Sequence, residues 1–153
     1  MKYRTLLVFL ATAILLAACA PAASNPNQPT QVPQKQSENT TQTDSQGAVT
    51  FDVTPLNLKN PAESLQFDVS MSTHSVDLSM DLAKLATLTT DTGETVQATL
   101  WDGPKGGHHV EGKLSFPTSQ NGKSILDGVK QLTLTIKDVD APERTFVWEL
   151  SAK

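Results

Sequence analysis

The chain has 153 residues, of which 38% are hydrophobic and 18% are charged, and its formal net charge is −4 at pH 7. Its 12 Lys and Arg residues form no dense cluster, so nucleic acid is not an expected partner and docking on anionic lipid through a basic face is not expected either. The single cysteine excludes an intramolecular disulfide, so a folded domain has to be stabilised by its apolar core.

The first 18 residues are typical of a secretory signal peptide. Lys2 and Arg4 precede a mainly apolar run, residues 5–16, which is shorter than the about 20 residues that cross a membrane. The run ends in Leu-Ala-Ala-Cys, residues 16–19, which resembles the lipobox of bacterial lipoproteins. The resemblance implies that Cys19 receives a diacylglycerol thioether and becomes the first residue of the mature chain.

This resemblance also implies a location. The lipid on Cys19 would hold an exported protein at the cell membrane or the outer membrane, so the bilayer is its first expected partner. Removal of residues 1–18 takes away two basic residues and leaves 10 basic and 16 acidic ones, a balance of −6. An ordinary secretory signal followed by an incidental cysteine is the alternative interpretation.

Residues 19–46 are predicted to be the lipidated N-terminus and a disordered linker. The stretch 20–46 is rich in Pro, Gln, Asn, Ser and Thr, with one Val and no aromatic residue. Such a segment cannot bury enough apolar surface to offset its ordering entropy. Residues 47–153 are therefore predicted to form a single domain.

Most of this domain alternates apolar and polar residues with a period of two, which predicts β-strands. The expected strands are 49–53, 65–71, 76–82, 87–90, 95–100, 110–116, 132–136 and 146–150, with a helical turn at 81–86. The parity of the apolar positions changes between Met71 and Val76, so a turn or bulge is expected there.

The pattern predicts an all-β fold, an antiparallel immunoglobulin-like β-sandwich of about seven to eight strands, with a small closed barrel as the competing architecture. One-sided apolar alternation buries its face only against a second such sheet. The expected core consists of Phe51, Leu65, Phe67, Val69, Met71, Leu78, Met80, Val96, Leu100, Leu114, Phe116, Leu132, Leu134, Ile136, Phe146 and Trp148.

The candidate metal ligands are the three histidines and nearby carboxylates. His74 lies at the parity change, and His108 and His109 follow a glycine-rich stretch and lead into the strand 110–116. Imidazole and carboxylate ligands suit Cu(II) or Zn(II), which gives a hypothetical site with a carboxylate from Asp77, Asp102 or Glu111. A blue-copper site is excluded because it needs a free cysteine thiolate. The alternative is that the histidines are ordinary hydrogen-bonded residues, and no metal is expected to be required for folding.

Two function classes remain open at this point. The domain resembles the immunoglobulin-like domains of small bacterial surface lipoproteins, which implies a tethered accessory role and not an enzyme. No nucleophile elbow, phosphate-binding loop or EF-hand pattern is present. The chain is thus expected to be either a metal-binding lipoprotein or a structural or protein-binding module, with the stretch 101–109 as a contact surface for another envelope protein. Trp101 is expected to be either an exposed anchor or packed over the end of the sandwich.

Overall fold

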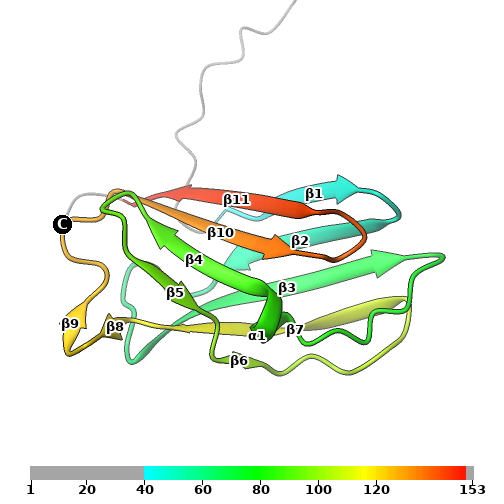
Figure 1. Ribbon diagram of the computed structural model, residues 1–153, viewed down its shortest axis with the longest axis horizontal. Coiled ribbons are helices and arrows are strands. Elements are labelled where there is room, and N and C mark those ends of the chain that lie inside the picture. The colour runs from blue at the N-terminus through cyan, green and yellow to red at the C-terminus, as the bar shows by residue number, and fades with distance from the viewer. Residues whose placement is uncertain (1–39, 151–153) are drawn as a thin grey trace, which may run out of the picture. The chain divides into compact units, whose positions relative to one another are not determined.

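A computed structural model describes residues 40–150, which form an antiparallel β-sandwich (Figure 1). The five-stranded sheet has the order β1-β2-β3-β7-β6, and the four-stranded sheet has the order β11-β10-β4-β5. The larger sheet consists of β1 (Gln42–Gln46), β2 (Val49–Pro55), β3 (Ser64–Thr73), β7 (His109–Pro117) and β6 (Leu100–Trp101). The smaller sheet consists of β11 (Glu143–Glu149), β10 (Gln131–Lys137), β4 (Ala86–Thr90) and β5 (Thr95–Gln97). A one-turn helix, α1 (Leu82–Leu85), and a hairpin of β8 (Ser119–Gln120) and β9 (Lys123–Ser124) complete the domain.

The connectivity is that of an immunoglobulin-like sandwich. Taken in chain order, β2, β3, β6 and β7 occupy the places of strands A, B, D and E, while β4, β5, β10 and β11 occupy those of C, C′, F and G. Strand β1 is added outside strand A. The prediction of an all-β immunoglobulin-like sandwich is confirmed, and the closed barrel is not formed.

The core lies between the two sheets and has an aromatic centre. Strand β3 shows why, because every second side chain along its ten residues is buried. Phe67 packs edge-on against Phe116 at a centroid distance of 5.7 Å and lies 5.2 Å from Trp148 on the facing sheet. All three side chains are fully buried, so these contacts tie the two layers together.

The predicted domain boundary is wrong, because the folded part begins before residue 47. Strand β1 lies within the predicted linker, and it pairs with β2 along its whole length. Its side chains are all polar, so composition does not reveal that it belongs to a sheet. The β1–β2 turn begins with Gly47 at φ +61°, and a Cβ at this position would collide with Asp140. Cys19, the predicted signal peptide and most of the predicted linker lie outside the described residues.

Two predicted strands also differ from the structure. Residues 76–81 are irregular, since this segment crosses the end of the sandwich and does not join a sheet. The predicted strand 95–100 is divided into β5 and β6, which belong to different sheets. Among the described residues, no helix has the length and hydropathy that a membrane span requires.

Candidate functional site

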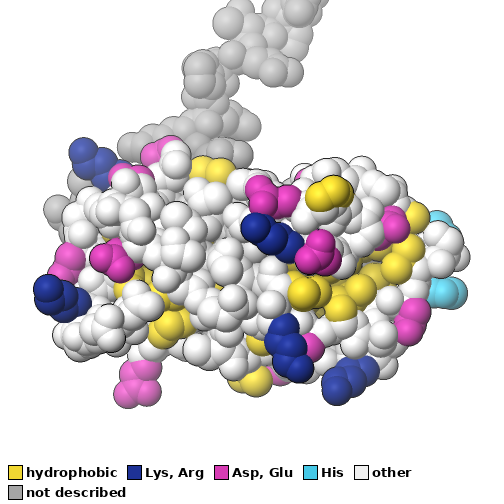
Figure 2. All heavy atoms as spheres, in the orientation of Figure 1, with side chains coloured by type: hydrophobic (Ala, Val, Ile, Leu, Met, Phe, Trp, Pro, Cys, Tyr) yellow, Lys and Arg dark blue, Asp and Glu magenta, His cyan; other side chains and the backbone are white. Residues whose placement is uncertain are grey.

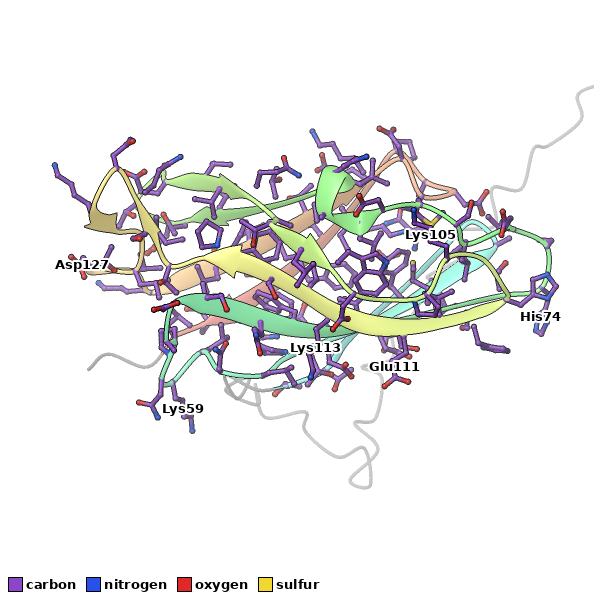
Figure 3. The ribbon with its side chains drawn as sticks, turned by 90° about the horizontal axis from the view of Figure 1, so that it is seen from below. Lys59, His74, Lys105, Glu111, Lys113 and Asp127 are labelled. Carbon is purple, nitrogen blue, oxygen red and sulfur yellow. The ribbon has the colours of Figure 1, made fainter. Side chains whose placement is uncertain are left out.

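The three histidines lie at one end of the domain, where β3 ends and β7 begins. His109 is the first residue of β7 and pairs with Ser72, and the main-chain N–H of Thr73 donates to the carbonyl of His108 at 2.9 Å. His74 follows β3 directly and lies at the tip of the domain (Figure 3). The histidine side chains in view lie at this end of the molecule (Figure 2). The pairing of β3 with β7 therefore brings these residues to one end, with all three side chains exposed.

The loop before β7 is fastened to the segment after β3. The N–H of Gly106 donates to the carbonyl of Leu78 at 3.1 Å, and the N–H of Leu78 donates to the carbonyl of Gly107 at 3.4 Å. The hydroxyl of Thr73 accepts hydrogen bonds from the N–H groups of Ser75 and Val76. The backbone that carries His74 and His108 is thus held by main-chain and hydroxyl contacts.

The candidate carboxylates are not gathered around the histidines. Glu111 pairs with Ser70 and lies back along β7, away from His74 (Figure 3). Asp102 accepts a hydrogen bond from the N–H of Lys113, and Asp77 lies near Gly106. Within residues 40–150, no three His, Cys, Asp or Glu side chains are grouped so that they could hold a metal ion. The predicted combination of imidazoles and a carboxylate is therefore not assembled in this structure.

A second polar arrangement lies along one side of the sandwich, where β1 meets β11. We call it the sealed side, and it centres on Arg144, whose side chain is fully buried. The guanidinium forms an ion pair with Asp44 and donates to the carbonyls of Gln46 and Val139. It also lies 4.8 Å from the ring centroid of Phe51. The buried cation is therefore compensated by one ion pair, by main-chain carbonyls and by an aromatic ring.

Two glutamines extend the sealed side. The N–H of Val147 donates to the side-chain carbonyl of Gln42 at 3.1 Å, and the amide nitrogen of Gln42 donates back to the carbonyl of Val147. Gln46 donates to the carbonyl of Glu143 at 3.2 Å. The β10–β11 pairing directs the main-chain groups of Glu143 and Val147 away from β10. Side chains of β1 therefore bind groups that would otherwise form an unpaired strand edge.

The opposite side of the sandwich is formed by β5 and β6, and we call it the open side. Each of these strands is the last one in its sheet. The main-chain N–H of Thr90 donates to the carbonyl of Glu94, and that of Ala98 donates to the carbonyl of Ala86. These bonds show which residues of β4 and β5 form hydrogen-bonded pairs. In that pattern the N–H and C=O groups of residues 95 and 97 point away from β4. No strand of the described chain pairs with them on that side.

The open side also carries the most exposed large hydrophobic residue of the described chain. Leu100 is 54% exposed, so its place in the predicted core is wrong. The chain changes sheets at residues 98–99, and this change reverses which parity faces inward. Trp101, not Leu100, packs inward and is partly buried, with its ring over Gly103. Its Nε1 is the one fully buried side-chain nitrogen or oxygen of the described residues that has no hydrogen-bond partner.

The stretch of chain that forms the open side carries no charged residue, and one acidic residue lies at each of its ends. The seven residues 95–101 read Thr-Val-Gln-Ala-Thr-Leu-Trp, with no charged residue, Pro or Gly. Glu94 and Asp102 flank this stretch, and both side chains are exposed. Such a stretch on a strand edge lacks the charges and prolines by which proteins usually prevent edge pairing.

The sequence interpretation missed the residues of the sealed side. Arg144 lies on the same face of its strand as Phe146 and Trp148, two residues and four residues further along. A charged residue at an inward position of a strand indicates a buried cation, so this feature could have been recognised from the sequence. Gln42 and Asp44 gave no such signal, because their partners are more than 90 residues away in the chain.

No protein-family model matches the chain, and a search of curated proteins found no match. A solved structure of a DUF4426 family protein from Pseudomonas aeruginosa is similar over 71% of this chain and 94% of its own. The two chains are 13% identical, with a TM-score of 0.40.

Proposed function

We propose that the protein is an exported lipoprotein of the cell envelope, whose domain is a non-catalytic module that binds another envelope protein through the open side. The observation that carries this proposal is the contrast between the two sides of the sandwich. Side chains of β1 occupy the edge of β11, whereas the edge formed by β5 and β6 has an exposed leucine and unpaired main-chain groups. Exposed strand edges and apolar anchors are the features by which partner proteins dock.

Membrane attachment rests on the Leu-Ala-Ala-Cys motif at residues 16–19. A Cys19→Ser variant should lose labelling by a fatty-acid precursor and should move from the membrane fraction to the soluble fraction. The control is Ser24→Ala, which lies in the same segment and should keep both properties. Unchanged labelling and retention of the Cys19→Ser variant would exclude lipidation.

Partner binding can be tested by photo-crosslinking in the cells that make the protein. A photoreactive amino acid at Leu100 should give a discrete adduct, whereas the same group at Thr145, on the edge strand of the sealed side, should give none. Excess soluble wild-type domain should compete for the Leu100 adduct, and a Leu100→Arg domain should compete poorly. Equal adducts from both positions, or none from Leu100, would contradict the proposal.

A second candidate function is binding of Cu(II) or Zn(II) at the histidine end. The observation in its favour is the hydrogen bond of 2.9 Å between Thr73 and His108, which places His74 and His108 on adjacent chain segments. Two imidazoles can bind such an ion together with an external ligand, and Asp77 or Glu111 would have to move to complete the set. This site would store or transfer a metal and is not needed for the fold.

Calorimetric titration with Zn(II) and Cu(II) tests this second candidate. Binding should be lost in both His74→Ala and the double variant His108→Ala/His109→Ala, if the site is shared. A Glu149→Gln variant on β11, remote from the histidine end, is the matched control. Binding that is indifferent to His74 would exclude a shared site.

A further inference from the structure

The open side provides a template for one added strand. Strand β5 is held in an extended conformation by contacts with α1 and β4. The side-chain amide nitrogen of Gln97 donates to the carbonyls of Ala83 and Ala86 at 2.7 and 2.8 Å. The hydroxyls of Thr95 and Thr89 lie 3.1 Å apart. A strand that is already ordered loses little conformational entropy when another segment pairs with it.

The available main-chain groups set the register of such a segment. The N–H and C=O groups of residues 95 and 97 point outward from β5, so an incoming strand can form a hydrogen-bonded pair at each of the two positions. Leu100 follows on β6, in the other sheet, and its exposed side chain offers an apolar contact to the part of the segment that extends beyond β5.

Charge selects the kind of segment. Glu94 and Asp102 lie at the two ends of the uncharged stretch, eight residues apart in the chain. Charges on exposed groups act over about one Debye length, about 8 Å at physiological salt, so each carboxylate acts on the part of an incoming segment that lies next to it. A segment with a basic residue at each end meets both carboxylates, and a segment with acidic ends is repelled by both.

We propose that β5 accepts an extended segment of a partner protein as an added strand, in which about seven uncharged residues are flanked by Lys or Arg. This inference rests on the proposed function, since it specifies how the open side binds its partner. A second copy of this chain fits the edge less well, because antiparallel pairing of two such acid-flanked edges adds like charges at the contact.

The experiment measures peptide binding by fluorescence anisotropy, with the full chain in a mild nonionic detergent. The probe is the nonapeptide Lys-Thr-Val-Gln-Ala-Thr-Leu-Trp-Lys, and the comparison peptide has the chain's own acidic ends in place of the lysines. The lysine-flanked peptide should bind at least about tenfold more tightly at low salt, and the difference should shrink at high salt. Methylation of alternate peptide nitrogens should abolish binding, because it removes main-chain donors and leaves the side chains in place.

A pair of variants at one position provides the control on the protein side. Thr95→Pro removes an outward N–H and should weaken peptide binding at least about tenfold, whereas Thr95→Val keeps the N–H and should bind as the wild type does. Equal binding of the two peptides, or binding that tolerates methylation, would overturn strand addition. Concentration-dependent dimerisation of the chain through this edge, without peptide binding, would overturn it in favour of a second copy. These failures leave the photo-crosslinking result untouched, whereas the absence of an adduct at Leu100 would overturn the proposed function itself.

Discussion

The sealed and open sides of the sandwich each consist of one edge strand from each sheet. They differ in whether the outward main-chain groups of these strands have hydrogen-bond partners. On the sealed side, β1 supplies Gln42, Asp44 and Gln46 to the main chain and side chains of β11. On the open side, the edges of β5 and β6 have no such cover in the described chain. The comparison teaches that closing a sandwich edge does not require a further strand pairing, because side-chain amides and one ion pair can satisfy it.

The two tryptophans show the same contrast within one residue type. Trp148 is fully buried, and its Nε1 donates to the carbonyl of Thr40 at 2.9 Å. Trp101 also has a buried Nε1, but this atom has no partner among the described residues. An unpaired buried donor costs about 1–3 kcal/mol, so the open side is expected to contribute less to stability than the sealed side.

The largest expected effect comes from removal of β1. A chain that begins at Gly47 leaves the Arg144 guanidinium buried without Asp44, and breaking a buried pair in this way costs about 3–5 kcal/mol. Urea unfolding should show this loss relative to a chain that begins at Thr40. Equal stability of the two chains would mean that the sealed side is dispensable.

The next effect isolates the buried cation. Arg144→Met should destabilise the domain by about 3 kcal/mol, because Asp44 and the carbonyl of Gln46 lose a charged donor. Arg144→Lys should recover only part of this loss, since an ammonium group cannot reproduce the planar fork. Denaturant midpoints measure both, with Lys113→Met on the exposed face of β7 as a control that should change little.

Proline substitution compares the two edges directly. Val147→Pro removes the donor that binds Gln42 and should cost about 1–3 kcal/mol. Thr95→Pro removes an N–H that points away from β4 and should cost less than about 1 kcal/mol. Thermal unfolding of both variants checks the difference, and a larger loss at Thr95 would reverse our assignment of the two sides.

The smallest effect separates the two indole nitrogens. Trp148→Phe breaks the hydrogen bond to Thr40, whereas Trp101→Phe removes a donor that has no partner. Trp101→Phe removes the unpaired donor from a partly buried ring, whereas Trp148→Phe breaks a hydrogen bond in a fully buried one, so the difference should be at least about 1 kcal/mol in favour of Trp101→Phe. Paired unfolding curves measure the difference, and an equal loss of stability in the two variants would contradict the assignment of Trp101 Nε1 as an unpaired donor.

The sequence predicted the fold class well because the apolar alternation is a local property. In β3 and β10 the expected inward residues are all buried. The alternation failed in residues 76–81, where Val76 and Met80 pack on the core from an irregular segment. It failed again at Leu100, because a change of sheet reverses the inward parity without any change in composition.

The candidate sites divide in the same way. The sequence predicted that the histidines lie near strand ends. It did not predict which carboxylates lie near them, because that depends on the register between β3 and β7. Glu111 lies opposite Ser70 and Asp102 binds the N–H of Lys113, which places neither beside His74.

By itself, the sequence determined most of the alternating strands, most of the apolar core and the Leu-Ala-Ala-Cys motif at residues 16–19, because each of these features depends only on residues that are neighbours in the chain. The tertiary structure alone decided where the domain begins and which edge of the sandwich is open. Strand β1 has no apolar face, so its sequence does not indicate a strand. It is ordered by contacts such as the ion pair between Asp44 and Arg144, which are 100 residues apart in the chain. Polar edges are satisfied by partners distant in the chain, so their presence or absence becomes visible only when the two sheets are placed together.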